Sequence, residues 1–236
     1  MSDLRPEDRL IVALDCDYER ALYLTVELSG VVSFFKIGHQ LAYAGGLDLA
    51  KQLVANGQRV FLDLKLHDIP NTVEQGVRAL AGLGVDFLTV HAYPKTMDAA
   101  LKGVQGTKTR LLGVTALTSD NRDDLVAAGY TSSPRMLVAH RANEAAKLGM
   151  HGLVCSPHEA YLARSQFGST PVTIVTPGIR PANTDANDQS RVGTPSFAIG
   201  EGADYLVVGR PITEASSPRA AAQAIIKEIA QCSSAN

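Results

Sequence analysis

Eight short runs of apolar and β-branched residues recur along this chain, and a helical pattern follows each of them. The runs predict strands at Arg9–Asp15, Ser33–Ile37, Arg59–Lys65, Asp86–His91, Arg110–Thr115, Gly152–Cys155, Val172–Thr176 and Tyr205–Gly209. The helical patterns predict helices at Tyr18–Ser29, His39–Asn56, Thr72–Gly84, Lys95–Gly103, Pro134–Leu148, Pro157–Phe167, Thr194–Gly200 and Pro218–Gln231. Eight consecutive strand–helix units favour an α/β barrel of the (β/α)8, or TIM-barrel, class.

The main alternative is an open, doubly wound sheet, in which a glycine-rich turn after the first strand normally holds a nucleotide phosphate. The first predicted strand instead runs into Ala13-Leu-Asp15-Cys-Asp17, which contains no glycine. No linker, charge run or shift in composition interrupts the sequence. We therefore expect residues 1–236 to form a single domain, with a short C-terminal tail over residues 231–236 that need not be ordered.

Composition argues against several classes of protein. A hydrophobic content of 45% and a charged content of 19% support a folded core rather than a disordered chain. The formal net charge of −2 gives no reason to expect nucleic-acid or membrane binding. The three cysteines match neither a disulfide framework nor a zinc motif. Free thiols, an N-terminus without an apolar signal segment and the lack of a membrane-spanning apolar run predict a cytoplasmic protein.

The stretch from Phe61 to Thr72 carries charges where a buried strand is expected. Because side chains alternate along a strand, Asp63 and Lys65 share one face with Phe61, while three leucines occupy the other face. Opposite charges enclosed on such a face are costly unless they pair. Asp68 follows the strand, where a loop is expected.

In a (β/α)8 barrel, reactive groups lie at the carboxyl ends of the strands and in the loops that follow. Lys36 comes two residues after Phe34 and is therefore expected on the inward face. Its ammonium can meet the charges of the third strand and of Asp68 at one mouth of the barrel. The other polar candidates at strand ends and in the following loops are Asp15, His91, Thr118, Ser119, Gly178, Arg180, Gln189, Gly209 and Arg210.

Several of these residues also have a structural interpretation. The charged groups can be ion pairs that fill the top layer of the barrel, although such layers cluster at functional sites. Asp15 can cap the first helix, for which Asp17 is better placed. Thr72-Val-Glu-Gln75 fits a capping box, which alone accounts for Thr72. His91 can be a hydrogen-bonded core histidine or a catalytic one.

The ends of the seventh and eighth strands indicate a phosphate site. Gly178 and Arg180 follow the seventh strand, and Gly209 and Arg210 follow the apolar run of the eighth. Loops at these two places form the usual phosphate site of the barrel fold, although the glycines can instead be simple turn residues. The loop over residues 177–193 is long and polar, as expected of a lid that closes over a ligand.

Together these patterns predict an enzyme that binds a small phosphorylated substrate and holds a carboxylate–ammonium cluster against the other end of that substrate. The sequence contains no cluster with metal-ligand spacing, no nucleophile elbow and no P-loop, so neither a metal nor a cofactor is expected. Lys36 or Lys65 can form a Schiff base. Neighbouring aspartates favour a protonated lysine instead, which suits an acid that stabilises and then protonates a carbanion.

The run Asp63-x-Lys65-x-x-Asp68-Ile-Pro-Asn-Thr72 resembles the signature of the orotidine 5′-phosphate decarboxylase family. Further matches cover essentially the whole chain, at Ala13–Asp15, Phe35–Gly38, Val114–Ser119, Val175–Arg180, Asp188–Gln189 and Val208–Pro211. The Asp-x-Lys-x-x-Asp core alone is less specific, because related sugar-phosphate decarboxylases and aldolases share it. The His-Asp-Ile-Pro-Asn-Thr continuation and the Gly-Ile-Arg and Gly-Arg-Pro segments make the match specific.

The resemblance implies decarboxylation of orotidine 5′-monophosphate to UMP and CO2, the last step of de novo pyrimidine synthesis, without cofactor or metal. It implies that Lys65 donates a proton to C6 of the pyrimidine, and that Lys36 and Asp63 complete the charge network. Asp68 and Thr72 would reach into the neighbouring subunit's site, so the active form would be a homodimer.

The resemblance also implies a set of substrate contacts. Asp15 and Lys36 would contact the ribose hydroxyls. Thr118, with Ser119 less clearly, would contact the pyrimidine edge. The phosphate would be held by Arg180, Gln189, Gly209 and Arg210, with Gln189 on the closing loop.

Two alternatives remain open on the same scaffold. One is a metal-dependent sugar-phosphate decarboxylase or aldolase, in which Asp63 would be a metal ligand. The other is a non-catalytic barrel that binds a phosphorylated ligand. The complete set of charges at Lys36, Asp63, Lys65 and Asp68 argues against the second.

Overall fold

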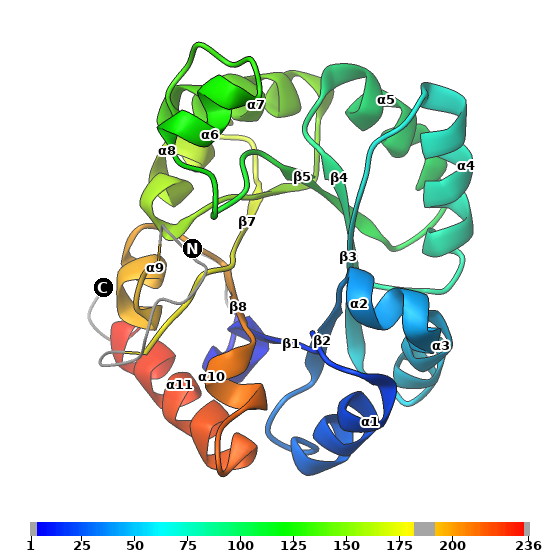
Figure 1. Ribbon diagram of the computed structural model, residues 1–236, viewed down its shortest axis with the longest axis vertical. Coiled ribbons are helices and arrows are strands. Elements are labelled where there is room, and N and C mark those ends of the chain that lie inside the picture. The colour runs from blue at the N-terminus through cyan, green and yellow to red at the C-terminus, as the bar shows by residue number, and fades with distance from the viewer. Residues whose placement is uncertain (1–3, 182–191, 234–236) are drawn as a thin grey trace.

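A computed structural model of the chain describes residues 4–181 and 192–233 (Figure 1). Eight strands, each parallel to its neighbours, close into a barrel in sequence order. The closed barrel confirms the (β/α)8 class predicted from the recurring strand–helix units. The strands are β1 (Leu10–Ala13), β2 (Phe34–Ile37), β3 (Arg59–Leu66), β4 (Phe87–His91), β5 (Arg110–Val114), β6 (Gly152–Val154), β7 (Thr173–Thr176) and β8 (Tyr205–Val208).

Helices surround the barrel and connect its strands (Figure 1). They are α1 (Tyr18–Glu27), α2 (His39–Leu41), α3 (Leu47–Ala55), α4 (Pro70–Ala81), α5 (Pro94–Gly103), α6 (Arg122–Ala127), α7 (Pro134–Leu148), α8 (Ala160–Ser165), α9 (Pro195–Gly200), α10 (Arg210–Thr213) and α11 (Pro218–Ser233). A π-helical turn, η2 (Ala42–Gly46), joins α2 to α3. The 3-10 turns η1 (Pro6–Arg9) and η3 (Pro157–Glu159) precede β1 and α8. Within the described residues, no helix has the length and apolar character needed to span a membrane.

Side chains from alternate strands fill the barrel interior in layers. An aromatic layer comes from even-numbered strands, where the ring centroid of Phe87 lies 5.2 Å from those of both Phe34 and Tyr205. The next layer toward the carboxyl ends comes from odd-numbered strands and comprises Ile11, Phe61, Leu112 and Val175. The layer above it comprises Lys36, Thr89, Val154 and Val207. The interior therefore becomes polar toward the carboxyl ends of the strands.

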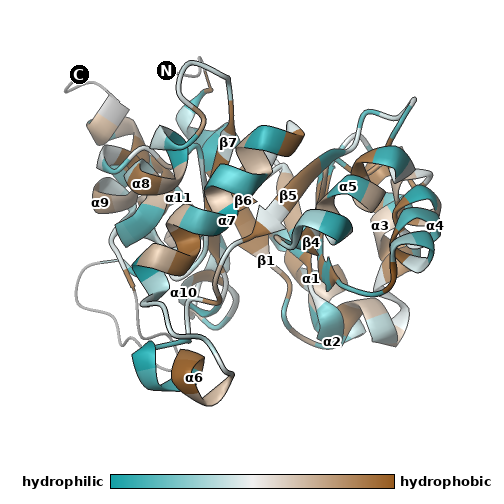
Figure 2. Ribbon diagram, turned by 90° about the horizontal axis from the view of Figure 1, so that it is seen from above, coloured by the Kyte–Doolittle hydropathy of each residue, from teal (hydrophilic) through white to brown (hydrophobic). Residues whose placement is uncertain are grey.

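A second apolar core lies between the outer faces of the strands and the helices. In α4, for example, Val73, Val77 and Ala81 recur at helical spacing, and all three are buried. Figure 2 shows the same division, because β1 and β5 are largely brown while the helices carry both brown and teal residues. This outer core fixes the strands that carry the polar groups.

Two of the predicted helices differ clearly from the helices in the structure. The helix expected over residues 39–56 is broken at Ala44 and Gly45, and Gly45 has a φ of 94°, which glycine adopts without strain. The helix expected from Thr72 begins at Pro70, with Ile69 as its N-cap and no side-chain cap. The capping box predicted at Thr72 is therefore absent, because that residue lies inside the first turn.

Other local predictions had mixed outcomes. Asp17 caps α1 as expected, because its carboxylate accepts a hydrogen bond from the backbone N–H of Arg20 at 2.8 Å. Helices α6 and α10 were not predicted, because they have only six and four residues and are too short to show helical periodicity. Helix α11 continues to Ser233, past residue 231, where the tail was expected to begin.

Candidate active site

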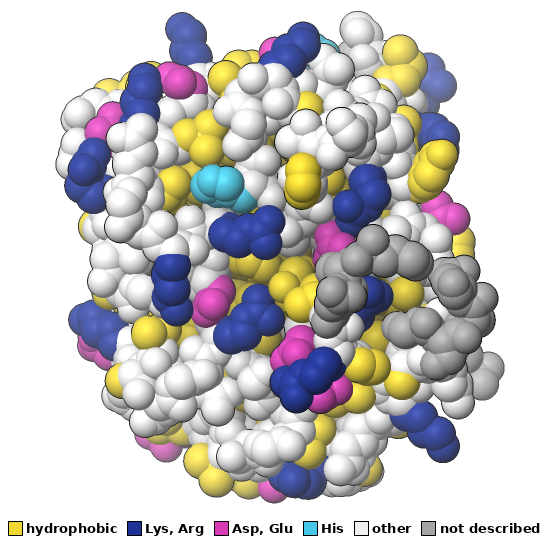
Figure 3. Space-filling model, turned by 180° about the vertical axis from the view of Figure 1, so that it is seen from behind, with side chains coloured by type: hydrophobic (Ala, Val, Ile, Leu, Met, Phe, Trp, Pro, Cys, Tyr) yellow, Lys and Arg dark blue, Asp and Glu magenta, His cyan; other side chains and the backbone are white. Residues whose placement is uncertain are grey.

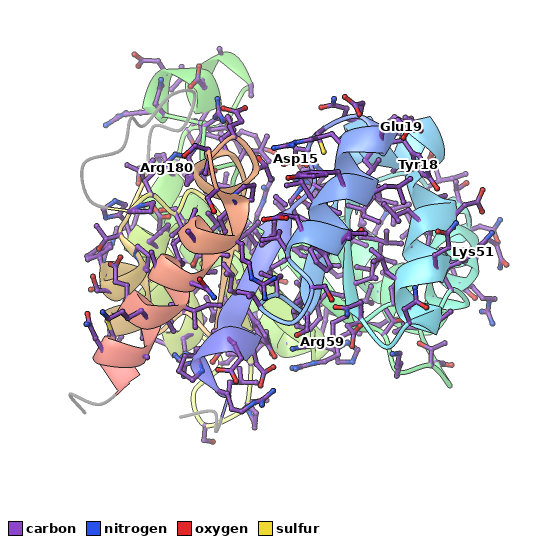
Figure 4. The ribbon with its side chains drawn as sticks, turned by 90° about the horizontal axis from the view of Figure 1, so that it is seen from below. Asp15, Tyr18, Glu19, Lys51, Arg59 and Arg180 are labelled. Carbon is purple, nitrogen blue, oxygen red and sulfur yellow. The ribbon has the colours of Figure 1, made fainter. Side chains whose placement is uncertain are left out.

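A cavity of about 430 Å³ opens at the carboxyl ends of the strands. Figure 4 shows Asp15 and Arg180 at this end of the barrel and Arg59 at the opposite end. The cavity brings together most of the residues predicted for the site from distant parts of the sequence. Those in its wall are Asp15, Lys36, Asp63, Lys65, Thr118, Ser119, Gly178, Arg180, Gly209 and Arg210.

Asp63 links two lysines in this cavity. Its Oδ2 atom lies 2.8 Å from Nζ of Lys65 and 3.6 Å from Nζ of Lys36. The Lys36 ammonium also donates a hydrogen bond to Oδ1 of Asp15 at 2.9 Å. Only 8% of the Lys36 side chain and 15% of the Asp63 side chain are exposed. Four groups of alternating sign therefore form one continuous chain, as enclosed charges require.

The pairing keeps the two most buried groups ionised. Burial by itself lowers the pKa of Lys36, but the carboxylates of Asp63 and Asp15 outweigh it and raise that pKa above its ordinary value. Burial raises the pKa of Asp63, but Lys36 and Lys65 outweigh it and lower that pKa below its ordinary value. The site therefore holds a carboxylate and ammonium groups side by side.

Thr89 on β4 positions both charged residues at the end of β3. Its hydroxyl donates to Oδ1 of Asp63 at 3.0 Å and accepts the backbone N–H of Lys65 at 2.9 Å. Lys65 has a φ of 47°, an uncommon value for a residue other than glycine. The β3–β4 pairing shifts register between Leu62 and Leu66, which accommodates this conformation. Thr89 was not predicted as a site residue. Its inward-facing position on the fourth predicted strand is the sequence feature that could have indicated its role.

The backbone at Gly38 allows Asp15 and Lys36 to meet. A Cβ atom at position 38 would lie 2.8 Å from Oδ1 of Asp15 and 3.0 Å from Nζ of Lys36. His39 also lines the cavity, and its Nε2 atom lies 2.9 Å from the carbonyl oxygen of Leu64. Neither Gly38 nor His39 was predicted as a site residue, although both directly follow the second predicted strand.

The loop after β5 contributes Thr118 and Ser119 to the cavity wall, as predicted. Thr118 is buried, and the Ser119 hydroxyl donates to Oδ1 of Asp120 at 3.3 Å. Leu117, which was not predicted, adds an apolar surface to the wall. Helix α6 follows this loop and projects beyond the carboxyl ends of the strands (Figure 2).

Arg180 and Arg210 line the cavity from the segments after β7 and β8. Arg180 donates one hydrogen bond to the carbonyl oxygen of Ile179 at 3.0 Å, while its buried Nε has no partner among the described residues. Burial lowers the pKa of Arg180, and the nearby positive charge of Arg210 lowers it further. Two adjacent guanidinium groups form an electropositive region that suits a phosphate. Gln189, the fourth predicted phosphate contact, lies outside the described residues.

Three other candidates do not line this cavity. Asp68 and Thr72 are exposed, and the Asp68 carboxylate accepts the backbone N–H of Ile69 at 2.6 Å. His91 is half-buried, and burial lowers its pKa, as do the charges of His67 and Arg141. His91 instead lines a separate pocket with Tyr93 and Arg141, which favours the structural interpretation of this residue. Within residues 4–181 and 192–233, no group of three or more His, Cys, Asp or Glu side chains is arranged to hold a metal ion.

Comparisons with known proteins agree with this geometry. Residues 8–225 match the sequence profile described as "Orotidine 5′-phosphate decarboxylase / HUMPS family". An orotidine 5′-phosphate decarboxylase of Rhodopseudomonas palustris (strain BisA53) is 56% identical over 223 residues, which cover 94% of each chain. One from Bradyrhizobium sp. (strain ORS 278) is 52% identical over 230 residues, covering 97% of this chain and 94% of the relative.

A solved structure supports the same relationship. The crystal structure of orotidine 5′-phosphate decarboxylase from Lactobacillus acidophilus superposes with a TM-score of 0.81 at 39% sequence identity. The match covers 93% of this chain and 98% of that chain. The family profile, the relatives and the solved structure thus agree with the chemistry suggested by two features of the cavity. These are the chain of charges formed by Asp15, Lys36, Asp63 and Lys65, and the pair of arginines Arg180 and Arg210. The chain belongs to the orotidine 5′-phosphate decarboxylase / HUMPS family.

Proposed function

We propose that this chain converts orotidine 5′-monophosphate to UMP and CO2. The observation that carries the proposal is the Lys36–Asp63–Lys65 charge chain, which shares one cavity with Arg180 and Arg210. That arrangement suits a substrate whose phosphate is remote from its reacting carbon. Family membership and the names of the relatives support the same reaction.

In the proposed reaction, the bond between C6 and the substrate carboxylate breaks, and its electron pair stays on C6. The Lys65 ammonium stabilises this carbanion and then gives it a proton, so the interaction is stronger in the transition state than in the ground state. Asp63 remains ionised, and its carboxylate repels the carboxylate of the substrate. Lys65 then regains a proton from water, and no cofactor or metal takes part.

The rest of the cavity would hold the nucleotide. Asp15 and Lys36 contact the ribose hydroxyls, and Thr118, with Ser119 less directly, contacts the pyrimidine edge. Arg180, Gly209, Arg210 and Gln189 hold the phosphate, whose binding energy helps to close the loop that carries Gln189. The buried, unpartnered Nε of Arg180 within the described structure supports this assignment, because a phosphate oxygen would satisfy it.

We also propose a homodimer in which Asp68 and Thr72 reach the neighbouring subunit's site. Both residues are exposed, and they follow the strand that carries the charge chain. Asp68→Ala and Lys65→Ala proteins, each inactive alone, should regain activity when mixed, because one hybrid site then has a complete set of residues. Absence of recovery, with subunit exchange verified by mass spectrometry of tagged chains, would contradict the shared site.

The proposed enzyme is a cytoplasmic single-domain protein that binds neither nucleic acid nor membranes. Its three cysteines are free thiols, which suits a reducing compartment. Turnover of orotidine 5′-monophosphate in excess EDTA, followed by loss of the orotate absorbance, tests the reaction. We expect an undiminished rate. Failure of turnover, or turnover that returns only with added divalent metal, would overturn the proposal.

A further inference from the structure

The opposite end of the barrel carries a group of arginines that the proposed reaction does not use. Inward positions on the odd-numbered strands continue one layer below Ile11, Phe61, Leu112 and Val175. Two residues before each of these, the same inward face carries Arg9, Arg59, Arg110 and Thr173. Figure 3 looks onto this end of the molecule and shows Lys and Arg side chains around an apolar centre.

Two of these three arginines are paired. Arg59 donates to the Tyr205 hydroxyl at 3.2 Å and lies 3.7 Å from Oδ1 of Asp86. Arg110 donates to the carbonyl oxygen of His151 at 3.1 Å. Arg59 therefore has an anionic partner, whereas the Arg110 side chain donates hydrogen bonds only to a neutral carbonyl group among the described residues.

Arg9 is different, because it is buried and has no ion-pair partner among the described residues. It is only 8% exposed, and its Nε is buried and makes no hydrogen bond. No ion pair or side-chain hydrogen bond involves Arg9 in the part of the chain that the structure describes. A buried guanidinium nitrogen that lacks a hydrogen-bond acceptor is costly, so an external anion that accepted a hydrogen bond from Arg9 would stabilise this end of the barrel.

Arg9 lines a cavity of about 630 Å³, larger than the one at the other end of the barrel. Arg110 and Thr173 share its wall, and Leu4, Val172 and Ile199 add an apolar surface. Arg164 also lines it but is engaged with Asp204 at 2.7 Å. The aromatic layer of Phe34, Phe87 and Tyr205 lies between this cavity and the candidate active site.

We propose that this second cavity is a binding site for a small organic anion. The carboxylate or phosphate of the ligand would pair with the Arg9 guanidinium, with Arg110 beside it, since the planar fork of arginine matches both groups. The apolar part of the ligand would lie against Leu4, Val172 and Ile199. The site is independent of the reaction at the carboxyl ends of the strands.

Isothermal titration calorimetry with benzoate tests the site, with benzyl alcohol as the neutral match and ionic strength held constant. Benzoate should bind wild-type protein and Arg180→Gln equally, because Arg180 lies at the other end of the barrel. Arg9→Gln and Arg110→Gln should each weaken binding by about tenfold or more. Circular dichroism of each variant establishes that it is folded, and Arg110→Gln serves alone if Arg9→Gln does not fold.

Four results would overturn the proposal. They are no saturable binding of benzoate to wild-type protein, equal binding of benzyl alcohol, unchanged binding by the folded arginine variants, and loss of binding in Arg180→Gln. The second would show an apolar cavity without anion preference. The last would place benzoate in the candidate active site instead.

Discussion

The Lys65 ammonium lies 2.8 Å from Oδ2 of Asp63, and the same oxygen is 3.6 Å from the Lys36 ammonium. One carboxylate thus holds two cations in a cavity that a substrate can enter. The arrangement places a proton donor at a fixed position and keeps its counter-charge ionised.

Replacing Lys65 removes the proposed proton donor. Lys65→Ala should lower kcat for orotidine 5′-monophosphate by about 10³-fold or more, because both proton transfer and carbanion stabilisation are lost. The matched control is Lys51→Ala, since Lys51 is an exposed lysine paired with Asp48 at 2.9 Å on α3. Stopped assays of both variants, with circular dichroism spectra, check the result. Near-normal turnover by folded Lys65→Ala would remove Lys65 from the reaction.

Thr89 acts through Asp63 and Lys65 rather than on the substrate. Thr89→Val has nearly the same shape but leaves the Asp63 oxygen and the Lys65 N–H unpaired, so it should cost about 1–3 kcal/mol of stability. We expect kcat to fall about tenfold or more with a smaller change in KM, because the charges are misplaced. Thr89→Ser restores the hydroxyl and should recover most of kcat. If valine and serine behave alike, the hydroxyl has no positioning role.

Gly38 provides a test of the Asp15–Lys36 pair. The Cβ of Gly38→Ala would contact Oδ1 of Asp15 at 2.8 Å and so displace the pair. We expect KM to rise about tenfold, since these residues are the proposed ribose contacts. Gly200→Ala is the matched control, because a Cβ there meets no atom within 4 Å. Equal KM values for the two variants would contradict the role of this close contact.

Asp63 should make stability depend on pH in the acid range. Its folded pKa is lowered, so its contribution is complete above the pKa of the unfolded chain, about 4. The contribution is lost as pH falls through the folded value. Wild-type protein should therefore lose more unfolding free energy than Asp63→Asn between about pH 5 and pH 2. Urea unfolding of both proteins across this range measures the difference, and parallel curves would show that Asp63 makes no such contribution.

The barrel was predictable from sequence because strand and helix periodicities are local properties. The charge cluster was predictable for the same reason, since strand alternation predicts Asp63 and Lys65 on one face. Thr89 was not, because its contact with both residues depends on the shifted β3–β4 register, which is a property of two strands together. Gly38 was missed because its importance lies in the space around it rather than in its chemistry. The helix break at Gly45 was not predicted, because a pattern of apolar residues gives no information about the backbone conformation of a glycine.

Arg210 distinguishes phosphate binding from nucleoside binding. It lies close enough to Arg180 to lower the pKa of that buried guanidinium, so a phosphate dianion between them would relieve the repulsion of two positive charges. Arg210→Ala should weaken UMP binding by about tenfold or more while leaving uridine binding unchanged. Arg219→Ala is the control, because Arg219 instead donates to the carbonyl oxygens of Glu27 and Ser29. Calorimetric titrations with both ligands at two salt concentrations check this. Equal losses for UMP and uridine would place Arg210 outside the phosphate site, since a phosphate contact affects only the charged ligand and weakens with salt.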